Sequence, residues 1–177
     1  LIESSFSGLI ITNNMKTAGI VSRVNADESE VMIYKCRFSG TIQAYGNYLT
    51  HGGITGDAYP EYFKVTIEKC IADGKVVING FGNNIAGIIS NYTTGGSYAK
   101  VINNISSLTV EDKGEDTYKS GLFDCLYIYS EKDIIACNVN TNKNVVNAIY
   151  SITIADDVTP IISHNFSAGS ADDDSND

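Results

Sequence analysis

Short runs of aliphatic and β-branched residues alternate along the chain with polar segments rich in Gly, Asn and Ser, and the runs recur at a constant distance. Four runs share Gly at the second position and an aliphatic residue at the third: 18–22, 52–56, 86–90 and 120–124. Their glycines, Gly19, Gly53, Gly87 and Gly121, lie 34 positions apart each time. A constant period of this size indicates an architecture built from stacked repeats.

A second repeated block follows each of these runs. Its last residue is Cys or Asn, which lies 17, 17, 17 and 16 residues after the Gly of the preceding run. It comprises 33–36, 67–70, 101–104 and 134–137. A partial unit opens the chain, where Ser4, Phe6, Gly8 and Ile10 match Cys36, Phe38, Gly40 and Ile42. A shorter fifth unit holds 147–151, aligned with 120–124, followed by Ile162, Asn165 and Gly169. We therefore expect Leu1 to lie inside a coil, with further coils or a cap upstream.

The repeated segments are short and β-branched and are broken by Gly and Asn, which favours strands over helices. Helical tetratricopeptide repeats have the same period of about 34 residues, but they need two amphipathic helices per repeat. The pattern predicts an all-β fold, a right-handed parallel β-helix (β-solenoid) of about five coils over residues 1–169. The acidic segment 170–177 is expected to be a tail or linker.

In such a solenoid, residues one period apart stack in ladders about 4.8 Å apart. Two ladders form the expected core: Ile20, Ile54, Ile88 and Leu122, and Ile33, Ile67, Val101 and Ile134. The Gly column is expected at a corner where a side chain would not fit or φ is positive.

Net charge and composition narrow the classes of molecule that the chain could bind. A formal charge of −9 and a pI near 4.6 argue against nucleic acid, because such a surface repels polyanions. There is no run of 18 apolar residues and no signal-peptide pattern. Because the chain begins at Leu1 without Met, we expect an excised or processed piece.

One family resembles this pattern. The segment Gly-Gly-Ile-Thr-Gly at 52–56, followed by Val-Thr-Ile-Glu-Lys-Cys-Ile-Ala-Asp-Gly-Lys-Val at 65–76, is similar to the GLUG-type repeat of bacterial secreted and surface proteins. The resemblance covers roughly residues 1–169, although Ala18 and Ala86 replace the first Gly and Asn104 replaces the Cys. It implies an extracellular or cell-surface location and an adhesion or spacer role, and it transfers no catalytic residues.

Cys36, Cys70 and Cys137 fall in one column with Asn104, where small inward side chains would fill a corner. A disulfide between neighbouring coils is compatible with this stacking, but the sequence does not require one. Inward Asn104 and Asn165 are expected to hydrogen-bond along the solenoid axis. Cys125 is expected in a loop. No spacing points to a metal or another cofactor.

Parallel β-helices include polysaccharide lyases and glycoside hydrolases that use clustered carboxylates, so a carbohydrate-active enzyme is the alternative function. The candidates, Asp57 and Asp124 with loop residues Asp27, Glu28, Glu61 and Asp133, show no Asp on adjacent coils accompanied by Lys or Arg. We therefore expect these acids to be scattered over the solvated surface. The favoured function is a non-catalytic module that acts in adhesion, in ligand binding or as a structural stalk.

Aromatic residues in the variable loops are the candidate binding residues. Stacking in register would place them on two strips, where exposed rings can contact sugars or anchor a protein. The set comprises Tyr45, Tyr48, Tyr59, Tyr62, Phe81, Tyr92, Tyr98, Tyr118 and Tyr127. The expected partner is a glycan or a host or cell-surface protein, and the open solenoid ends also allow oligomers. The alternative interpretation is that these rings fold back to cover the core.

Overall fold

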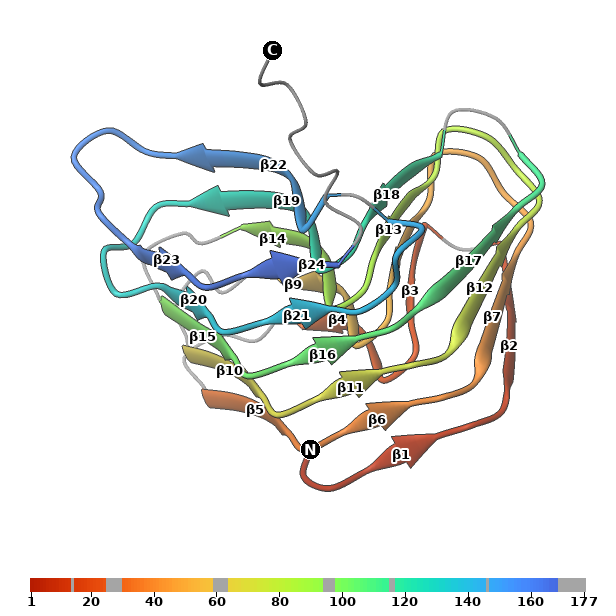
Figure 1. Ribbon diagram of the computed structural model, residues 1–177, viewed down its shortest axis with the longest axis horizontal. Coiled ribbons are helices and arrows are strands. Elements are labelled where there is room, and N and C mark those ends of the chain that lie inside the picture. Colours follow the sequence, from red (N-terminus) through yellow and green to blue (C-terminus); the bar gives the residue numbers. More distant parts are fainter. Residues whose placement is uncertain are drawn as a thin grey trace, which may run out of the picture.

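The computed structural model describes residues 1–13, 15–24, 30–58, 64–93, 98–114, 117–145 and 147–168. Every regular element in these ranges is a β-strand, and all strand pairs are parallel. The strands stack in chain order from the red first coil to the blue last coil (Figure 1). The structure is a parallel β-solenoid of about four turns, which confirms the expected fold class. Within these ranges there is no helix long and apolar enough to cross a membrane.

Five sheets, which we name A to E, form the walls of the solenoid. Sheet A contains β5 (Glu30–Tyr34), β10 (Lys64–Glu68), β15 (Tyr98–Ile102), β20 (Ile134–Ala136) and β23 (Ile161–Ser163). Sheet B contains β1 (Ser5–Phe6), β6 (Arg37–Phe38), β11 (Ile71–Ala72), β16 (Ile105–Ser106), β21 (Val139–Asn140) and β24 (Phe166–Ser167). Sheet C contains β2 (Leu9–Thr12), β7 (Thr41–Ala44), β12 (Lys75–Ile78) and β17 (Thr109–Asp112). Together A, B and C form three successive walls of each coil.

The remaining two sheets follow a sharp corner. Sheet D contains β3 (Lys16–Ala18), β8 (Thr50–Gly52), β13 (Asn84–Ala86) and β18 (Tyr118–Ser120). Sheet E contains β4 (Val21–Val24), β9 (Thr55–Ala58), β14 (Ile89–Thr93), β19 (Phe123–Ile128) and β22 (Ile149–Ile154). The chain then returns from sheet E to sheet A of the next coil.

The register follows the 34-residue period in the middle coils. Lys64 pairs with Tyr98, and Thr55 pairs with Ile89. The opening unit has a shorter offset, and Phe6 pairs with Phe38 as expected. Ile54, Ile88 and Leu122 are fully buried, and Ile20 is partly buried in the first coil. The first expected ladder is therefore a core ladder, and Leu1 does lie within a coil, hydrogen-bonded to Met32 and Tyr34.

The fourth coil corrects two expectations. Val101 pairs with Ile135, so Ile135 is the buried member of the second ladder and Ile134 is not. The inward Asn138, not Cys137, consequently follows Asn104 in the Cys/Asn column. Cys137 is exposed and adopts a left-handed backbone conformation with φ of 58°. The offset between Asn104 and Asn138 is again 34 residues. Asn138 Oδ1 accepts hydrogen bonds from the backbone N and from Nδ2 of Asn104, so these buried donors are satisfied.

The last coil is also shifted by one residue from the expected alignment. Ile149 pairs with Phe123 and not with Leu122. Ile162 pairs with Ile135, so the second ladder continues into the last coil as expected. Gly169 and the segment 170–177 lie outside the described residues.

Steric fit explains the Gly column, and none of its four members has a positive φ. A Cβ on Gly19 would overlap the ring of Phe38, and one on Gly87 would overlap Ser106 Oγ and Gly121 O. These glycines pack directly against sheet B. The backbone at the corner between sheets D and E therefore lies close to the sheet B wall of the solenoid. Of the two explanations that the sequence left open, the lack of space is the correct one.

Candidate functional site

Three aromatic side chains are exposed on the stacked turns that join sheet C to sheet D. Tyr45 and Tyr48 lie between β7 and β8, and Phe81 lies in the equivalent turn between β12 and β13. Their exposed fractions are 53%, 72% and 41%. The rings of Tyr48 and Phe81 meet edge to face with centroids 5.1 Å apart. We call Tyr45, Tyr48 and Phe81 the C–D ridge.

Hydrogen bonds between successive turns hold the ridge in place. Asn47 Oδ1 accepts a hydrogen bond from the backbone N of Phe81 at 3.1 Å. The buried Asn83 accepts from the backbone N of Leu49 at 2.9 Å and donates to Gly46 O at 3.1 Å. Each bond joins one coil to the next, so the backbone that carries the aromatic rings is fixed before any ligand arrives.

Tyr48 has a strained backbone, with φ of 57°. For a residue other than Gly this left-handed conformation costs about 1–2 kcal/mol. The residue one period later, Gly82, has φ of 65° and avoids that cost. A bulky exposed ring therefore stands at a position where Gly is the unstrained choice.

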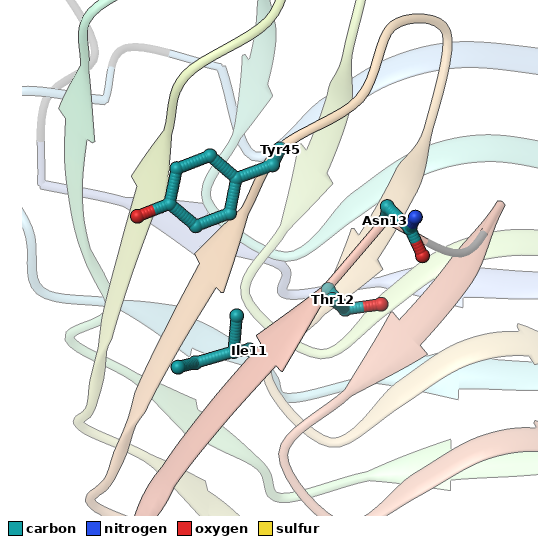
Figure 2. Close-up of a pocket in the computed structure, with 4 residues that line it drawn as sticks. All are labelled: Ile11, Thr12, Asn13 and Tyr45. Carbon is teal, nitrogen blue, oxygen red and sulfur yellow. The ribbon is translucent and has the colours of Figure 1, made fainter.

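A hollow of about 340 Å³ adjoins the ridge and is lined by Ile11, Thr12, Asn13 and Tyr45. Figure 2 shows Ile11 and Tyr45 on the same side of the two neighbouring strands, with Asn13 at the end of β2. Ile11 is 65% exposed. Gln43 Nε2 donates to the Tyr45 hydroxyl at 2.5 Å and so orients the ring. The hollow combines apolar surface with amide and hydroxyl groups, which suits a polar ligand with an apolar face.

The structure separates the other predicted aromatic residues. Tyr92 is fully buried in β14 and donates a hydrogen bond to Asp133 at 3.0 Å, so its expected exposure is wrong. Burial raises the pKa of Tyr92 well above its ordinary value. Tyr98 is half-buried, with Lys64 Nζ 5.6 Å from its ring centroid. Tyr118 is exposed and contacts Tyr150 with ring centroids 5.1 Å apart. Tyr127 is exposed on β19, far along the chain from the ridge.

Tyr59 and Tyr62 lie outside the described residues, as do Asp27, Glu28 and Glu61. Of the seven predicted aromatic residues that the structure describes, the ridge unites three: Tyr45, Tyr48 and Phe81. Ile11 and Asn13 were missed, because the sequence comparison matched the opening unit only as far as Ile10. Extending that match by one residue pairs Ile11 with Gln43 and would have placed Ile11 on the outer face of sheet C.

A second polar region lies where sheets D and E face each other, and we call it the D–E seam. Asp57 is fully buried there, and its carboxylate forms ion pairs with Lys16 and, at 3.5 Å, with Arg23. The residues paired with Asp57 in the two adjacent coils are Arg23 and Asn91, so Asp57 has no second Asp beside it in its column, but cations from the neighbouring coil do accompany it. The Asp57 Oδ1 atom has no hydrogen bond in the described structure.

Asp124 lies in the same seam, two coils further along. It is fully buried, and burial raises its pKa to about 6. The thiol of Cys125 donates to Asp124 Oδ2 at 3.5 Å, and Cys125 lies in strand β19 and not in a loop as expected. Burial, with the nearby Asp124 carboxylate, raises the pKa of this thiol to about 11, so it is a poor nucleophile.

His51 is the fully buried histidine of sheet D. Burial lowers its pKa to about 4, so the imidazole is neutral at physiological pH. Neither ring nitrogen of His51 has a hydrogen-bond partner among the described residues, and the Cys125 thiol bonds to Asp124 instead, so no His51–Cys125 pair is formed. Among the described residues, no group of three or more His, Cys, Asp and Glu side chains is arranged to hold a metal ion.

No family model, curated protein or solved structure matches this chain.

Proposed function

We propose that the chain is a non-catalytic binding module that takes a glycan at the C–D ridge and the adjoining hollow. The observation that carries the proposal is the exposed, strained Tyr48 packed edge to face against Phe81. Aromatic rings supply a flat apolar surface for a sugar ring, and Asn13 and Gln43 supply amide groups near Tyr45 for its hydroxyls.

The setting we propose is a bacterial secreted or cell-surface protein. Support comes from the resemblance of 52–56 and 65–76 to the GLUG-type repeat, together with the repeated coil itself. A rigid solenoid can present a ridge of this kind at a fixed distance from whatever carries it. A cell-surface protein as the partner is the other possibility that the same aromatic surface allows.

Glycan-array screening of the whole chain followed by calorimetric titration of the best glycan tests the proposal. Tyr48→Gly removes the ring and relieves the backbone strain, so we expect affinity to fall about tenfold or more while the thermal midpoint stays level or rises. Phe166→Ala is the matched control, because Phe166 is an exposed aromatic residue on sheet B, away from the ridge. Equal affinity of Tyr48→Gly and the unaltered chain would reject the ridge as the binding site.

The D–E seam favours one alternative, a carbohydrate-active enzyme of the lyase or glycoside hydrolase type. Asp57 with Lys16 and Arg23 provides the acid and cations that such chemistry uses, and Asp124 has the raised pKa of a general acid. Against it, both carboxylates are fully buried and a substrate would not reach them without movement of the sheets. To separate the two functions, the chain is incubated with the glycan that it binds, and the products are assayed for unsaturated or new reducing ends. If the chain is an enzyme, Asp57→Asn must abolish the turnover.

A further inference from the structure

One column of inward side chains runs through the turn between sheets A and B. Its members are Cys36, Cys70, Asn104, Asn138 and Asn165, one in each of five successive coils. Asn104 Nδ2 donates to Asn138 Oδ1 at 2.9 Å, and Asn138 Nδ2 donates to Asn165 Oδ1 at 2.8 Å. Side chains in this column therefore reach directly from one coil to the next.

Cys70 occupies its place in the column in the same way as the asparagines. Its thiol donates to Ile33 O at 3.5 Å, just as Asn104 Nδ2 donates to Ile67 O at 3.0 Å. Cys36 is next to Cys70 in the column, because the following residues, Arg37 and Ile71, pair in sheet B. The two thiols thus point into the same buried corner from neighbouring coils.

We infer that Cys36 and Cys70 are a disulfide-forming pair that covalently ties two neighbouring coils together, those of β6 and β11. Neighbouring parallel strands lie about 4.8 Å apart, within the Cα separation of about 4.4–6.8 Å that disulfides span. The two thiols lose two protons and two electrons as the Sγ–Sγ bond forms. A low-molecular-weight disulfide accepts the electrons and is reduced to two thiols. The bond would be the covalent counterpart of the amide contact between Asn104 and Asn138.

Burial determines when this oxidation can occur. Both thiols are buried, and burial raises the pKa of Cys70 to about 11, so the folded coil holds little of the reactive thiolate. The disulfide therefore forms while these two coils close during folding, or when they open. Phe6 and Ile10 of the opening coil, directly below Cys36, are only partly buried, so the bond would stabilise the core next to one open end of the solenoid.

The test is to unfold and refold the whole chain in a mixture of oxidised and reduced glutathione, using a Cys125→Ser/Cys137→Ser background. Alkylation and non-reducing peptide mapping should find the Cys36 and Cys70 peptides linked, with a mass 2 Da below that of the dithiol form. The thermal midpoint should be about 5–10 °C higher than in reductant. Two free, alkylated thiols after oxidative refolding would overturn the inference.

Cys70→Asn in the same background is the control variant, because Asn is the residue that the column uses in later coils. It should fold, and its thermal midpoint should not respond to reductant. A reductant-dependent midpoint in Cys70→Asn, or a midpoint in the parent that is the same in both buffers, would also overturn the inference.

Discussion

Asn138 lies directly above Asn104 in the next coil, and its Oδ1 accepts hydrogen bonds from both Nδ2 and the backbone N of Asn104, at 2.9 and 3.1 Å. Asn104 repeats the arrangement one coil lower, where its Oδ1 accepts from the backbone N of Cys70 at 2.9 Å. Each amide thus satisfies a buried backbone donor in one coil and links it to the next, which makes the column a continuous polar support inside an apolar core.

Asn104→Ala should therefore destabilise the fold strongly. It leaves the buried backbone N of Cys70 without its acceptor and removes the side-chain hydrogen bond to Ile67 O, and an unsatisfied buried group costs about 1–3 kcal/mol. We expect a loss of about 2–4 kcal/mol in the free energy of unfolding, measured by urea denaturation in reductant. Asn144→Ala, at an exposed turn, is the control and should change stability by less than about 0.5 kcal/mol.

Cys70→Asn should have the opposite effect under reducing conditions. The new amide can donate to Ile33 O, where the thiol now makes only a weak hydrogen bond at 3.5 Å. By analogy with Asn104, its Oδ1 can accept from the backbone N of Cys36. We expect a gain of about 1 kcal/mol in the free energy of unfolding by the same measurement. A loss of stability would show that the corner around Cys70 is too small for an amide.

Gly87→Ala should destabilise the solenoid at the corner between sheets D and E. The added methyl group would overlap Ser106 Oγ and the carbonyl of Gly121, and backbone that is paired on both sides cannot move away. Overpacking of this kind costs about 1–3 kcal/mol. Gly8→Ala is a useful control for thermal unfolding, because its Cβ would meet only the movable ring of Phe6, at 2.9 Å. Equal midpoints for the two variants would contradict the steric explanation.

The 34-residue period allowed most of the architecture to be predicted, because stacking requires every coil to have nearly the same length. The errors arose where residue identity was given more weight than the period. Matching Cys137 to Cys70 shortened the fourth coil by one residue, whereas a constant offset would have selected Ile135 and Asn138. The amide contacts along the axis, which the sequence predicted for Asn104 and Asn165, run through Asn138 and decide in its favour.

The candidate site was harder to predict than the fold. Period alone does not show whether an aromatic residue near a strand end points inward or outward. Tyr92 follows the inward column of Ala58 and is buried, whereas Tyr45 extends sheet C beyond Ala44 and is exposed. The ion pair of Asp57 with Lys16 could not be found either, because the corner between sheets D and E brings these residues together, whereas Arg23 lies one period before Asp57 and pairs with it in sheet E.

Asp124→Asn should change how stability depends on pH. Burial raises the pKa of Asp124 from its ordinary value of 3.8 to about 6 in the folded chain. Below pH 3.8 the carboxyl is protonated in both states, so it carries no penalty. As pH rises from 3.8 to 6, the unfolded chain releases the proton first, and the folded state loses stability relative to it.

Above pH 6 this loss is complete and constant, and a shift of about two pKa units corresponds to about 3 kcal/mol at most. Asn cannot ionise and can still accept a hydrogen bond from the neighbouring thiol of Cys125. We therefore expect Asp124→Asn to be up to about 3 kcal/mol more stable than the unaltered chain at pH 7.5, and nearly equal to it at pH 3.5. Urea denaturation at both pH values checks this, and a difference that does not vary with pH would show that Asp124 keeps its charge in the folded state by another contact.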